Sequence, residues 1–347
     1  MVASMPAPEP SSQNLSSPRN FAALLELLQP GMRALDGVLR EQVSHFEPEV
    51  RELAGYCLDS TGKRLRPLLV FLAGWSGRGE IDPLLVRAAA VVEMTHLATL
   101  VHDDIMDHGL LRRGRATVSA KDGPDVAVLL GDALFAQAMW LSTQFPTTEV
   151  CSSVAVATRQ VCTGEIVQTL GGPGAAPSRE RYRRIIDLKT AELFHVSCRL
   201  GARLGGGSED FVAAAGRFGR RLGLAYQIYD DLTDFLGTAE GAGKTLGTDW
   251  ASGKTTLPVL CLLERSTPTE AERLLQLLRS GADSVGAELT TRMRATGVFP
   301  AVGQEARTEI AAARAELAGW GAQPATAMLG ELASYLEGQL EKLLAAS

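Results

Sequence analysis

The chain has 347 residues, of which 46% are hydrophobic and only 5% aromatic, and its net charge is −6. A chain of this length can bury a large core without disulfides, and its acidic balance excludes a broad basic surface for nucleic acid. Its five cysteines are scattered without CxxC spacing, which indicates reduced thiols in a cytoplasmic protein and not disulfides or a zinc site.

The first 18 residues are rich in Pro, Ser and Ala and lack a hydrophobic signal core, so we expect a disordered tail over 1–18. Helical periodicity then continues over 19–347 without convincing strand alternation, which predicts an all-α, single-domain helical bundle. The longest nearly apolar run, Val126 to Leu141, is too short for a bilayer and contains Asp132, so no transmembrane segment is expected. We interpret Asp132 as a buried acid that needs a partner.

One or two amphipathic helices are expected from Phe21 to about Cys57. Three cations then surround the start of an apolar helix: Lys63, Arg64 and Arg66. Pro67 fits a first helical turn, and a helix N-terminus with cations attracts anions. The alternative is a solvated basic loop.

The next helix is apolar over 88–101 and then reaches three carboxylates, Asp103, Asp104 and Asp107. Anions are disfavoured at a helix C-terminus, where the helix dipole is already negative. Helical spacing places four polar side chains in one stripe: His96, Thr99, Asp103 and Asp107. A buried stripe of this kind requires a cation; the alternative is a solvated helix end with its acids in water.

A second helix ends in the same arrangement, with Asp230, Asp231 and Asp234. Glycines at 216, 219 and 223 form one face of that helix, and they indicate either close packing against a neighbour or an open groove. Two acid clusters on apolar helices can face each other across a cavity. Because hard carboxylate oxygens suit Mg²⁺ together with phosphate, the pattern predicts a Mg²⁺–diphosphate site at the mouth of a bundle.

Cations recur near both clusters. Arg112 and Arg113 follow the first cluster, and a Gly-rich loop after the second carries Lys244 and Lys254. That loop is not a nucleotide-binding P-loop, because the motif requires glycine where Thr248 stands and no strand precedes it.

Together, the segments GKRLRP, HDDIMD…RRG, GD, KTA, YQIYDDLTD and GTDWASGKTTLP resemble the trans-prenyltransferases, the all-α isoprenyl diphosphate synthases. The resemblance covers about residues 40 to 265 in order. In that family two DDxxD motifs face each other across a deep central cavity and hold Mg²⁺ on an allylic diphosphate. It implies a homodimeric, chain-elongating prenyltransferase that condenses isopentenyl diphosphate with an allylic prenyl diphosphate.

The resemblance also implies roles for individual residues. The metal ligands would be Asp103, Asp107 and Asp230, supported by Asp104, Asp231 and Asp234. Isopentenyl diphosphate would be bound by Lys63, Arg66, His96 and Arg113. The allylic diphosphate would be bound by Arg112, Lys189, Thr190, Gln227, Lys244 and Lys254, with Lys189 also catalytic. The released diphosphate would serve as the base.

Product length is expected to depend on Ala98 and Thr99, which precede Asp103 by five and four residues. In the family, aromatic residues here stop the product short, and this small pair resembles synthases of long polyprenyl chains. Geranylgeranyl or farnesyl diphosphate is the alternative product, if a floor such as Trp140 closes the cavity. A terpene cyclase or a non-catalytic synthase subunit is less favoured, because a second diphosphate site and all six acids are present.

Overall fold

The computed structural model describes residues 21–59, 62–77, 80–171, 176–237, 247, 250, 254–280, 285–321 and 323–345. The expected tail over 1–18 and Lys244 lie outside the described residues. The helices are α1 (Phe21–Ser44), α2 (Pro48–Asp59), α3 (Leu65–Ala73), α4 (Pro83–Met106), α5 (Val118–Asp122), α6 (Pro124–Thr143), α7 (Glu149–Gly171), α8 (Arg179–Ile186), α9 (Glu192–Leu204), α10 (Glu209–Leu236), α13 (Leu257–Glu264), α14 (Pro268–Ser280), α15 (Val285–Ala295), α16 (Val298–Leu317) and α17 (Pro324–Ala345). A π-helical turn, Asp187–Ala191, joins α8 to α9, and a 3₁₀ turn, Ala318–Trp320, follows α16.

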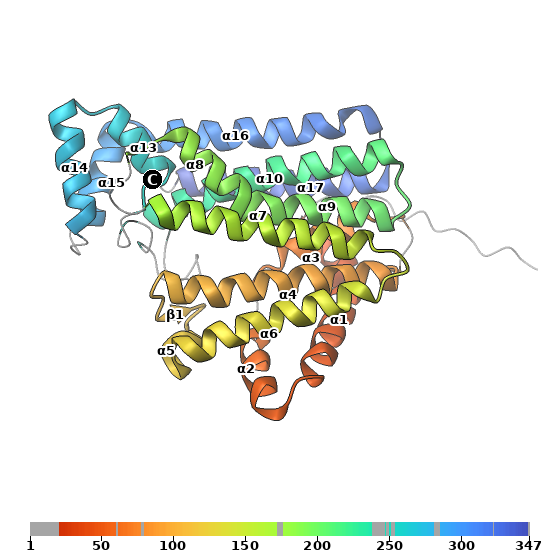
Figure 1. Ribbon diagram of the computed structural model, residues 1–347. Helices are drawn as coiled ribbons and strands as arrows, with labels where there is room; N and C mark the ends of the chain where they lie inside the picture. Colours follow the sequence, from red (N-terminus) through yellow and green to blue (C-terminus); the bar gives the residue numbers. More distant parts are fainter. Residues whose placement is uncertain are drawn as a thin grey trace, which may run out of the picture.

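The architecture is all-α, as the sequence predicts, and its long helices lie side by side in a bundle (Figure 1). Within the described residues the strands form one small hairpin, β1 (Leu111–Arg112) with β2 (Arg115–Ala116), which the sequence did not indicate. Its two turn residues, Arg113 and Gly114, have φ values of 53° and 75°. Positive φ at both positions suits a two-residue hairpin turn, and the hairpin places Arg112 beside Asp104 at the end of α4.

Helix α4 lies within the bundle and carries the first acid cluster at its end. It begins where the Asp82 side chain accepts a hydrogen bond from the Leu84 amide (2.7 Å), with Pro83 in the first turn. Its apolar face packs on α1, α3, α6 and α9. The C-terminal ends of α4 and α10 lie at the same end of the molecule, beside β1 and α13 (Figure 1). The two acid clusters therefore share one end of the bundle.

The glycine face of α10 is a packing surface, which decides between the two alternatives that the sequence left open. A methyl group on Gly219 would lie 2.4 Å from the Phe194 carbonyl oxygen, and one on Gly223 would lie 2.7 Å from the Ala191 Cα. No side chain fits at those distances. These glycines bring α10 close to α9, so they are no evidence for a groove that holds a long product.

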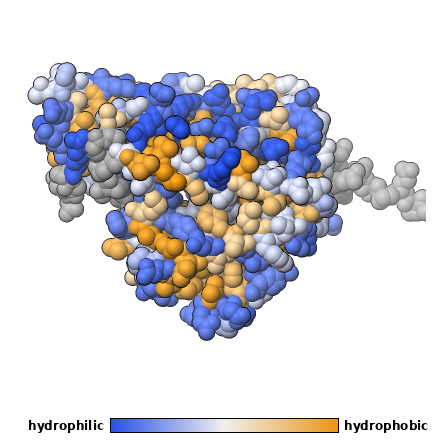
Figure 2. All heavy atoms as spheres, viewed as in Figure 1, coloured by the Kyte–Doolittle hydropathy of each residue, from blue (hydrophilic) through white to orange (hydrophobic). Residues whose placement is uncertain are grey.

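Helices α4 and α6 are both long and apolar enough to cross a membrane by length and composition alone. For α4 this reflects its position in the core, where most of its residues are buried. Helix α6 instead shows apolar side chains on its outer face, including Leu129 and Trp140, which are 67% and 48% exposed. Figure 2 shows apolar atoms gathered over this part of the surface.

Asp132 corrects one expectation. The apolar run predicts a buried acid at this position, yet the Asp132 side chain is 65% exposed and lies 3.6 Å from His102 Nε2. The apolar run around Asp132 covers the outward face of α6 as well as its core-facing side. An apolar run is therefore not sufficient evidence that a residue within it is buried. The neighbouring Gly131 allows His102 to approach the helix, since a methyl group there would lie 2.1 Å from the ring nitrogen.

Candidate active site

Each carboxylate of the first cluster faces a cation from another part of the chain. Lys189 Nζ lies 3.5 Å from Asp103 Oδ1, and Lys254 Nζ lies 2.9 Å from Asp107 Oδ2. Arg112 binds Asp104 through two nitrogens, Nε and Nη2, at 2.9 and 2.7 Å. Such a two-nitrogen pair fixes both groups firmly. Asp104 is therefore committed to the hairpin, while Asp103 and Asp107 face cations from more distant segments.

The two buried acids of the second cluster accept hydrogen bonds from neutral donors among the described residues. Asp231 is only 2% exposed and accepts hydrogen bonds from the Tyr182 hydroxyl (2.7 Å) and the Gln227 amide (2.9 Å). Asp234 is also buried and accepts from the Gly247 amide at 2.8 Å. Asp230 is less buried than these two neighbours. The buried pair thus joins α10 to Tyr182 of α8 and to Gly247, and Asp230 occupies the more accessible position.

A polar chain connects the π-helical turn to the second cluster. Thr190 donates a hydrogen bond to Gln227 (2.7 Å), which in turn donates to Asp231. The adjacent Lys189 forms an ion pair with Glu165 of α7 besides its contact with Asp103. Burial raises the pKa of Glu165, an effect that the nearby Lys189 opposes. Lys189, Thr190 and Gln227, which the family resemblance assigns to the allylic diphosphate, are thereby brought to one place.

Sequence reasoning assigned no role to Glu165 or Tyr182. Both touch predicted site residues, and neither belongs to a recognisable motif. The available signal was weak: Glu165 is an acid in a partly apolar helix, and Tyr182 follows a loop. Only the packing of α7 and α8 against the site identifies them.

A second group of cations lies at the start of α3. The Arg66 guanidinium, through Nη1, lies 2.9 Å from His96 Nε2 and 5.2 Å from the centre of the Phe194 ring. Burial, followed by the nearby positive charges of Arg66 and Arg113, holds the pKa of His96 well below its ordinary value. A neutral His96 accepts at Nε2 from Arg66 and keeps a proton on Nδ1, which can be donated to an anion.

Arg113 joins this second group through the hairpin turn. Its guanidinium passes so close to Gly62 that a methyl group on that residue would lie 2.2 Å from Nη2. Arg64 does not join Arg66 in this group, because its side chain turns away and pairs with Asp36 of α1. Arg66, His96 and Arg113 therefore lie together near the start of α3, without Arg64.

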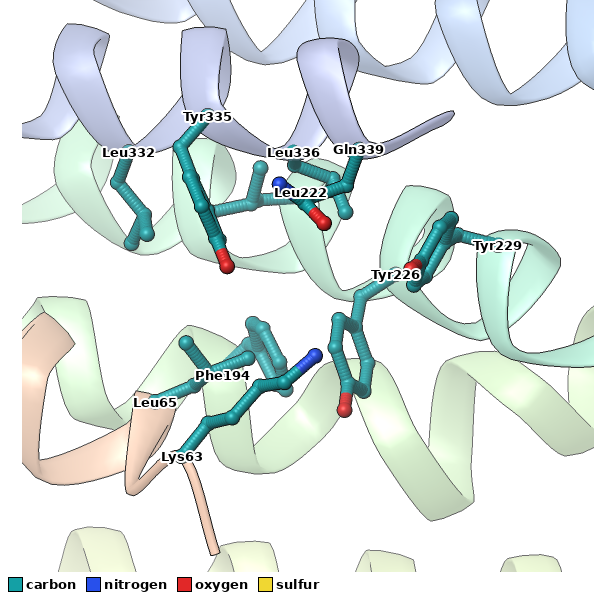
Figure 3. Close-up of a pocket in the computed structure, with 10 residues that line it drawn as sticks. All are labelled: Lys63, Leu65, Phe194, Leu222, Tyr226, Tyr229, Leu332, Tyr335, Leu336 and Gln339. Atoms are coloured by element: carbon teal, nitrogen blue, oxygen red, sulfur yellow. The ribbon is translucent and has the colours of Figure 1, made fainter. Parts of the chain in front are cut away.

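Lys63 extends into a cavity between α3, α9, α10 and α17 (Figure 3). Tyr226 of α10 lies on one side of the ammonium group, and Tyr335 and Gln339 of α17 form the opposite wall. The segment after Leu257 carries no recognisable chemical motif in its sequence. The fold nevertheless brings the last helix to the side of a predicted binding residue.

We expect His96 to make stability depend on pH. Its pKa is lowered on folding from a value near 6.5, so the unfolded chain binds more protons as pH falls through about 6.5. Stability from this group is thus complete above about pH 6.5 and is lost below it. His96→Gln keeps an oxygen that can accept from Arg66 but does not titrate. Its free energy of unfolding, from urea denaturation, should fall less than that of the wild type between about pH 7 and pH 5. Parallel pH curves for the two chains would contradict this prediction.

The two residues expected to control product length differ in accessibility. Ala98 is completely buried, whereas Thr99 is partly exposed and donates its hydroxyl to the His96 carbonyl (2.7 Å). Thr99 also lies on the Asp103 face of α4. Trp140, suggested as a cavity floor, is wrong for that role, because it lies exposed on α6 with its ring edge-on to His45 at 5.6 Å.

The donors at this end of the bundle fit a hard divalent cation. Within the described parts of the chain, no three His, Cys, Asp or Glu side chains converge as a preformed metal cluster. The cationic groups of Lys189 and Lys254 stand beside Asp103 and Asp107 instead. Carboxylates on two helices, without a complete protein cage, match Mg²⁺, which keeps waters or substrate phosphates among its ligands.

An all-α bundle whose two carboxylate clusters share one end, with cations beside the first of them, has the fold and the residue types of the isoprenoid synthase class. The family model described as polyprenyl synthetase matches residues 47–291. The chain belongs to the polyprenyl synthetase family, and it is a prenyltransferase of the polyprenyl diphosphate synthase type.

Known proteins are similar to this chain in sequence and fold over most of its length. An octaprenyl diphosphate synthase from Haemophilus influenzae is 34% identical over 260 residues, which are 74% of this chain and 78% of that protein. The structure of a decaprenyl diphosphate synthase from Rhodobacter capsulatus has a TM-score of 0.83 and 32% identity, covering 93% of this chain and 99% of that one. A polyprenyl synthase from Caulobacter crescentus, complexed with calcium and isoprenyl diphosphate, has a TM-score of 0.85 and 31% identity, covering 90% and 96%. A divalent metal is thus bound within the family.

Proposed function

We propose that the chain condenses isopentenyl diphosphate with an allylic prenyl diphosphate in a Mg²⁺-dependent reaction and forms a long trans-polyprenyl diphosphate. The observation that carries the proposal is the pairing across the site. Asp103 meets Lys189, and Asp107 meets Lys254 from 147 residues away in the chain. A separate set of cations, Arg66 and Arg113, lies at the start of α3. The first site would bind its anion together with a metal ion, and the second would bind its anion through cations alone. Two such sites match two different diphosphates.

The first chemical step breaks the allylic C–O bond and leaves an allylic cation and diphosphate. Mg²⁺, held by Asp103, Asp107 and Asp230, would supply positive charge to the diphosphate oxygens. Lys189, Arg112 and Lys254 add fixed positive charge at the same place, and such preorganised charge is usually the largest contribution to catalysis. Thr190 and Gln227 position the leaving diphosphate through the hydrogen-bond chain to Asp231.

The second step forms the new C–C bond. Lys63, Arg66, His96 and Arg113 hold isopentenyl diphosphate so that its double bond attacks the allylic cation, and the released diphosphate accepts the proton that is then lost. Water must be excluded while the cation exists. The apolar side chains that precede the acids on α4, among them the buried Ala98 and Val101, exclude water from this region.

We also propose that the chain works as a homodimer in the cytoplasm. Apolar side chains are exposed on α6 and also on α7, where Ile166 and Leu170 are 56% and 82% exposed. An extended apolar surface on neighbouring helices favours association. All five cysteines are free thiols, which suits a reducing compartment. Light scattering on the purified chain tests the dimer, and a monomer at micromolar concentration would contradict it.

The function is tested by incubating the purified chain with Mg²⁺, isopentenyl diphosphate and an allylic diphosphate, then resolving prenyl products by length. We expect elongated polyprenyl diphosphates and no product when Mg²⁺ is chelated. Cyclic hydrocarbon would identify a terpene cyclase, and absence of turnover would identify a non-catalytic subunit. A product that ends at farnesyl or geranylgeranyl diphosphate would support the shorter-chain alternative.

The two diphosphate sites should respond to different mutations. Arg113→Ala is expected to raise KM for isopentenyl diphosphate, and Lys254→Ala to raise KM for the allylic substrate. Each substitution should raise the corresponding KM about 10-fold, because this is the loss typical of one hydrogen bond to a charged group. Steady-state kinetics with each substrate varied in turn measure both constants.

Arg115→Ala is the matched control for this comparison. Arg115 belongs to the same hairpin, but its guanidinium lies 4.0 Å over the Tyr56 ring, away from both sites. Both KM values should remain within about 2-fold, since this cation–π contact involves neither set of diphosphate-binding residues. The assignment of cations to sites is wrong if Arg113→Ala and Lys254→Ala weaken the same substrate.

A further inference from the structure

The π-helical turn Asp187–Ala191 determines where Lys189 and Thr190 point. A π turn holds more residues than an α turn, is rare, and is found frequently at functional sites. If this turn relaxed to α-helical winding, the segments on its two sides would rotate relative to each other by about 100°, the step of one residue at 3.6 per turn. Lys189 would then leave Asp103 and Glu165. The site therefore depends on whatever holds this turn.

Two glycines leave room for the turn. A methyl group on Gly164 of α7 would lie 2.9 Å from the Leu188 Cβ and 3.0 Å from the Lys189 amide nitrogen. On the other side, a methyl group on Gly223 of α10 would lie 2.7 Å from the Ala191 Cα. The turn is thus packed between two helices at positions where a side chain would collide with it. Room alone does not select the π-helical form, so an attractive contact is also needed.

Arg220 of α10 supplies that contact. Its Nη1 donates to both carboxylate oxygens of Asp187, at 3.0 and 2.9 Å, and its Nη2 donates to Glu192. Asp187 is the first residue of the turn, and Glu192 directly follows its last. One planar guanidinium therefore bridges both ends of the turn. Glu192 is only 6% exposed, so without Arg220 its charge would be buried without that partner, which is strongly unfavourable.

We propose that Arg220 is a positioning residue for the allylic diphosphate. By binding Asp187 and Glu192 together, its guanidinium holds the π-helical form, and that form places the Lys189 ammonium beside Asp103 and the Thr190 hydroxyl on Gln227. Arg220 itself touches neither metal ligands nor substrate. The inference rests on the proposed function only in assigning the allylic diphosphate to Lys189 and Thr190.

The test compares Arg220→Met with Arg221→Met. Arg221 is the adjacent residue on α10 and also pairs with a buried glutamate, Glu309 of α16 (3.1 Å), but it has no contact with the π turn. We expect Arg220→Met to lower kcat/KM for the allylic substrate by about 10- to 100-fold, the effect of a small misplacement of binding groups. KM for isopentenyl diphosphate should stay within about 2-fold, and Arg221→Met should change neither. Equal effects of the two variants, or equal effects on both substrates, would overturn the proposal.

A double variant separates positioning from stability. Arg220→Met combined with Glu192→Gln removes the uncompensated buried charge, so its thermal unfolding temperature should recover toward the wild type. Its kinetic defect should persist, because the bridge across the turn is still absent. Recovery of both stability and kcat/KM would show that Arg220 acts on stability alone and would overturn the proposal.

A binding measurement keeps this test independent of turnover. Calorimetry with Mg²⁺ and inorganic diphosphate should show weaker binding to Arg220→Met than to Arg221→Met. If the wild-type chain forms no prenyl product, the proposed function fails while this comparison still tests Arg220. If the chain turns over and the two variants bind diphosphate equally, the inference fails while the function stands.

Discussion

Asp103→Asn should reduce the rate of prenyl transfer by at least about 100-fold, which corresponds to about 2.7 kcal/mol of transition-state stabilisation. The substitution keeps the shape of the side chain and removes its charge, which both Lys189 and a bound Mg²⁺ require. Because Asp103 is part of the helix end and is not fully buried, the fold should survive. The measurement is kcat at saturating substrates over a series of Mg²⁺ concentrations.

Two features distinguish loss of a metal ligand from loss of the Lys189 contact. Half-maximal activity of Asp103→Asn should require more Mg²⁺ than the wild type, whereas a lost ion pair alone would leave the metal dependence unchanged. Asp132→Asn is the control, since it makes the same chemical change on the neighbouring α6, where the carboxylate is exposed. It should turn over normally. Near-normal turnover of Asp103→Asn at saturating Mg²⁺ would falsify the assignment of the metal site.

Thr99→Phe should shorten the main product by several isoprene units and leave the first condensation largely intact. Thr99 lies one helical turn before Asp103, about 6 Å along the axis, on the same face of α4. A growing chain that runs down from the diphosphates would meet an aromatic ring there. Ala98→Phe is a poorer test, because Ala98 is completely buried and a large side chain would overpack the core at a cost of about 1–3 kcal/mol.

Thr308→Phe controls for the general effect of replacing a helical threonine with phenylalanine. Thr308 lies on the exposed side of α16, and its hydroxyl donates to the carbonyl four residues earlier (2.9 Å). Its product distribution should match the wild type in reactions with excess isopentenyl diphosphate. The proposed role of Thr99 is rejected if Thr99→Phe gives that same distribution, or if the wild type already stops at farnesyl diphosphate.

Much of the site could be predicted because its signals are local. The two clusters that begin at Asp103 and Asp230 share one spacing, and each ends an apolar helix. Short-range helix geometry is enough to place such residues on one face. The cations Lys189 and Lys254 were predicted through family motifs, and the structure brings both to the first cluster. Lys244 lies outside the described residues.

Other features depend on which helices become neighbours, and no local period encodes this. Asp132 sits in an apolar run, yet the outward orientation of α6 leaves it exposed. The glycine positions in the sequence of α10 are compatible with a groove or with packing, and the position of α9 against them decides for packing. The contact of Tyr182 with Asp231 likewise joins residues 49 apart, on different helices.

By itself, the sequence determined the all-α class, the ends of the acid-bearing helices and the residue types of the proposed Mg²⁺–diphosphate site, because helix periodicity and ligand chemistry act over a few residues. The tertiary structure decided which cation faces which acid, where α17 meets Lys63, and that Arg220 bridges both ends of the turn carrying Lys189. The physical reason is that these contacts follow from helix packing. The free energy of packing is summed over the whole core, so no short segment determines it.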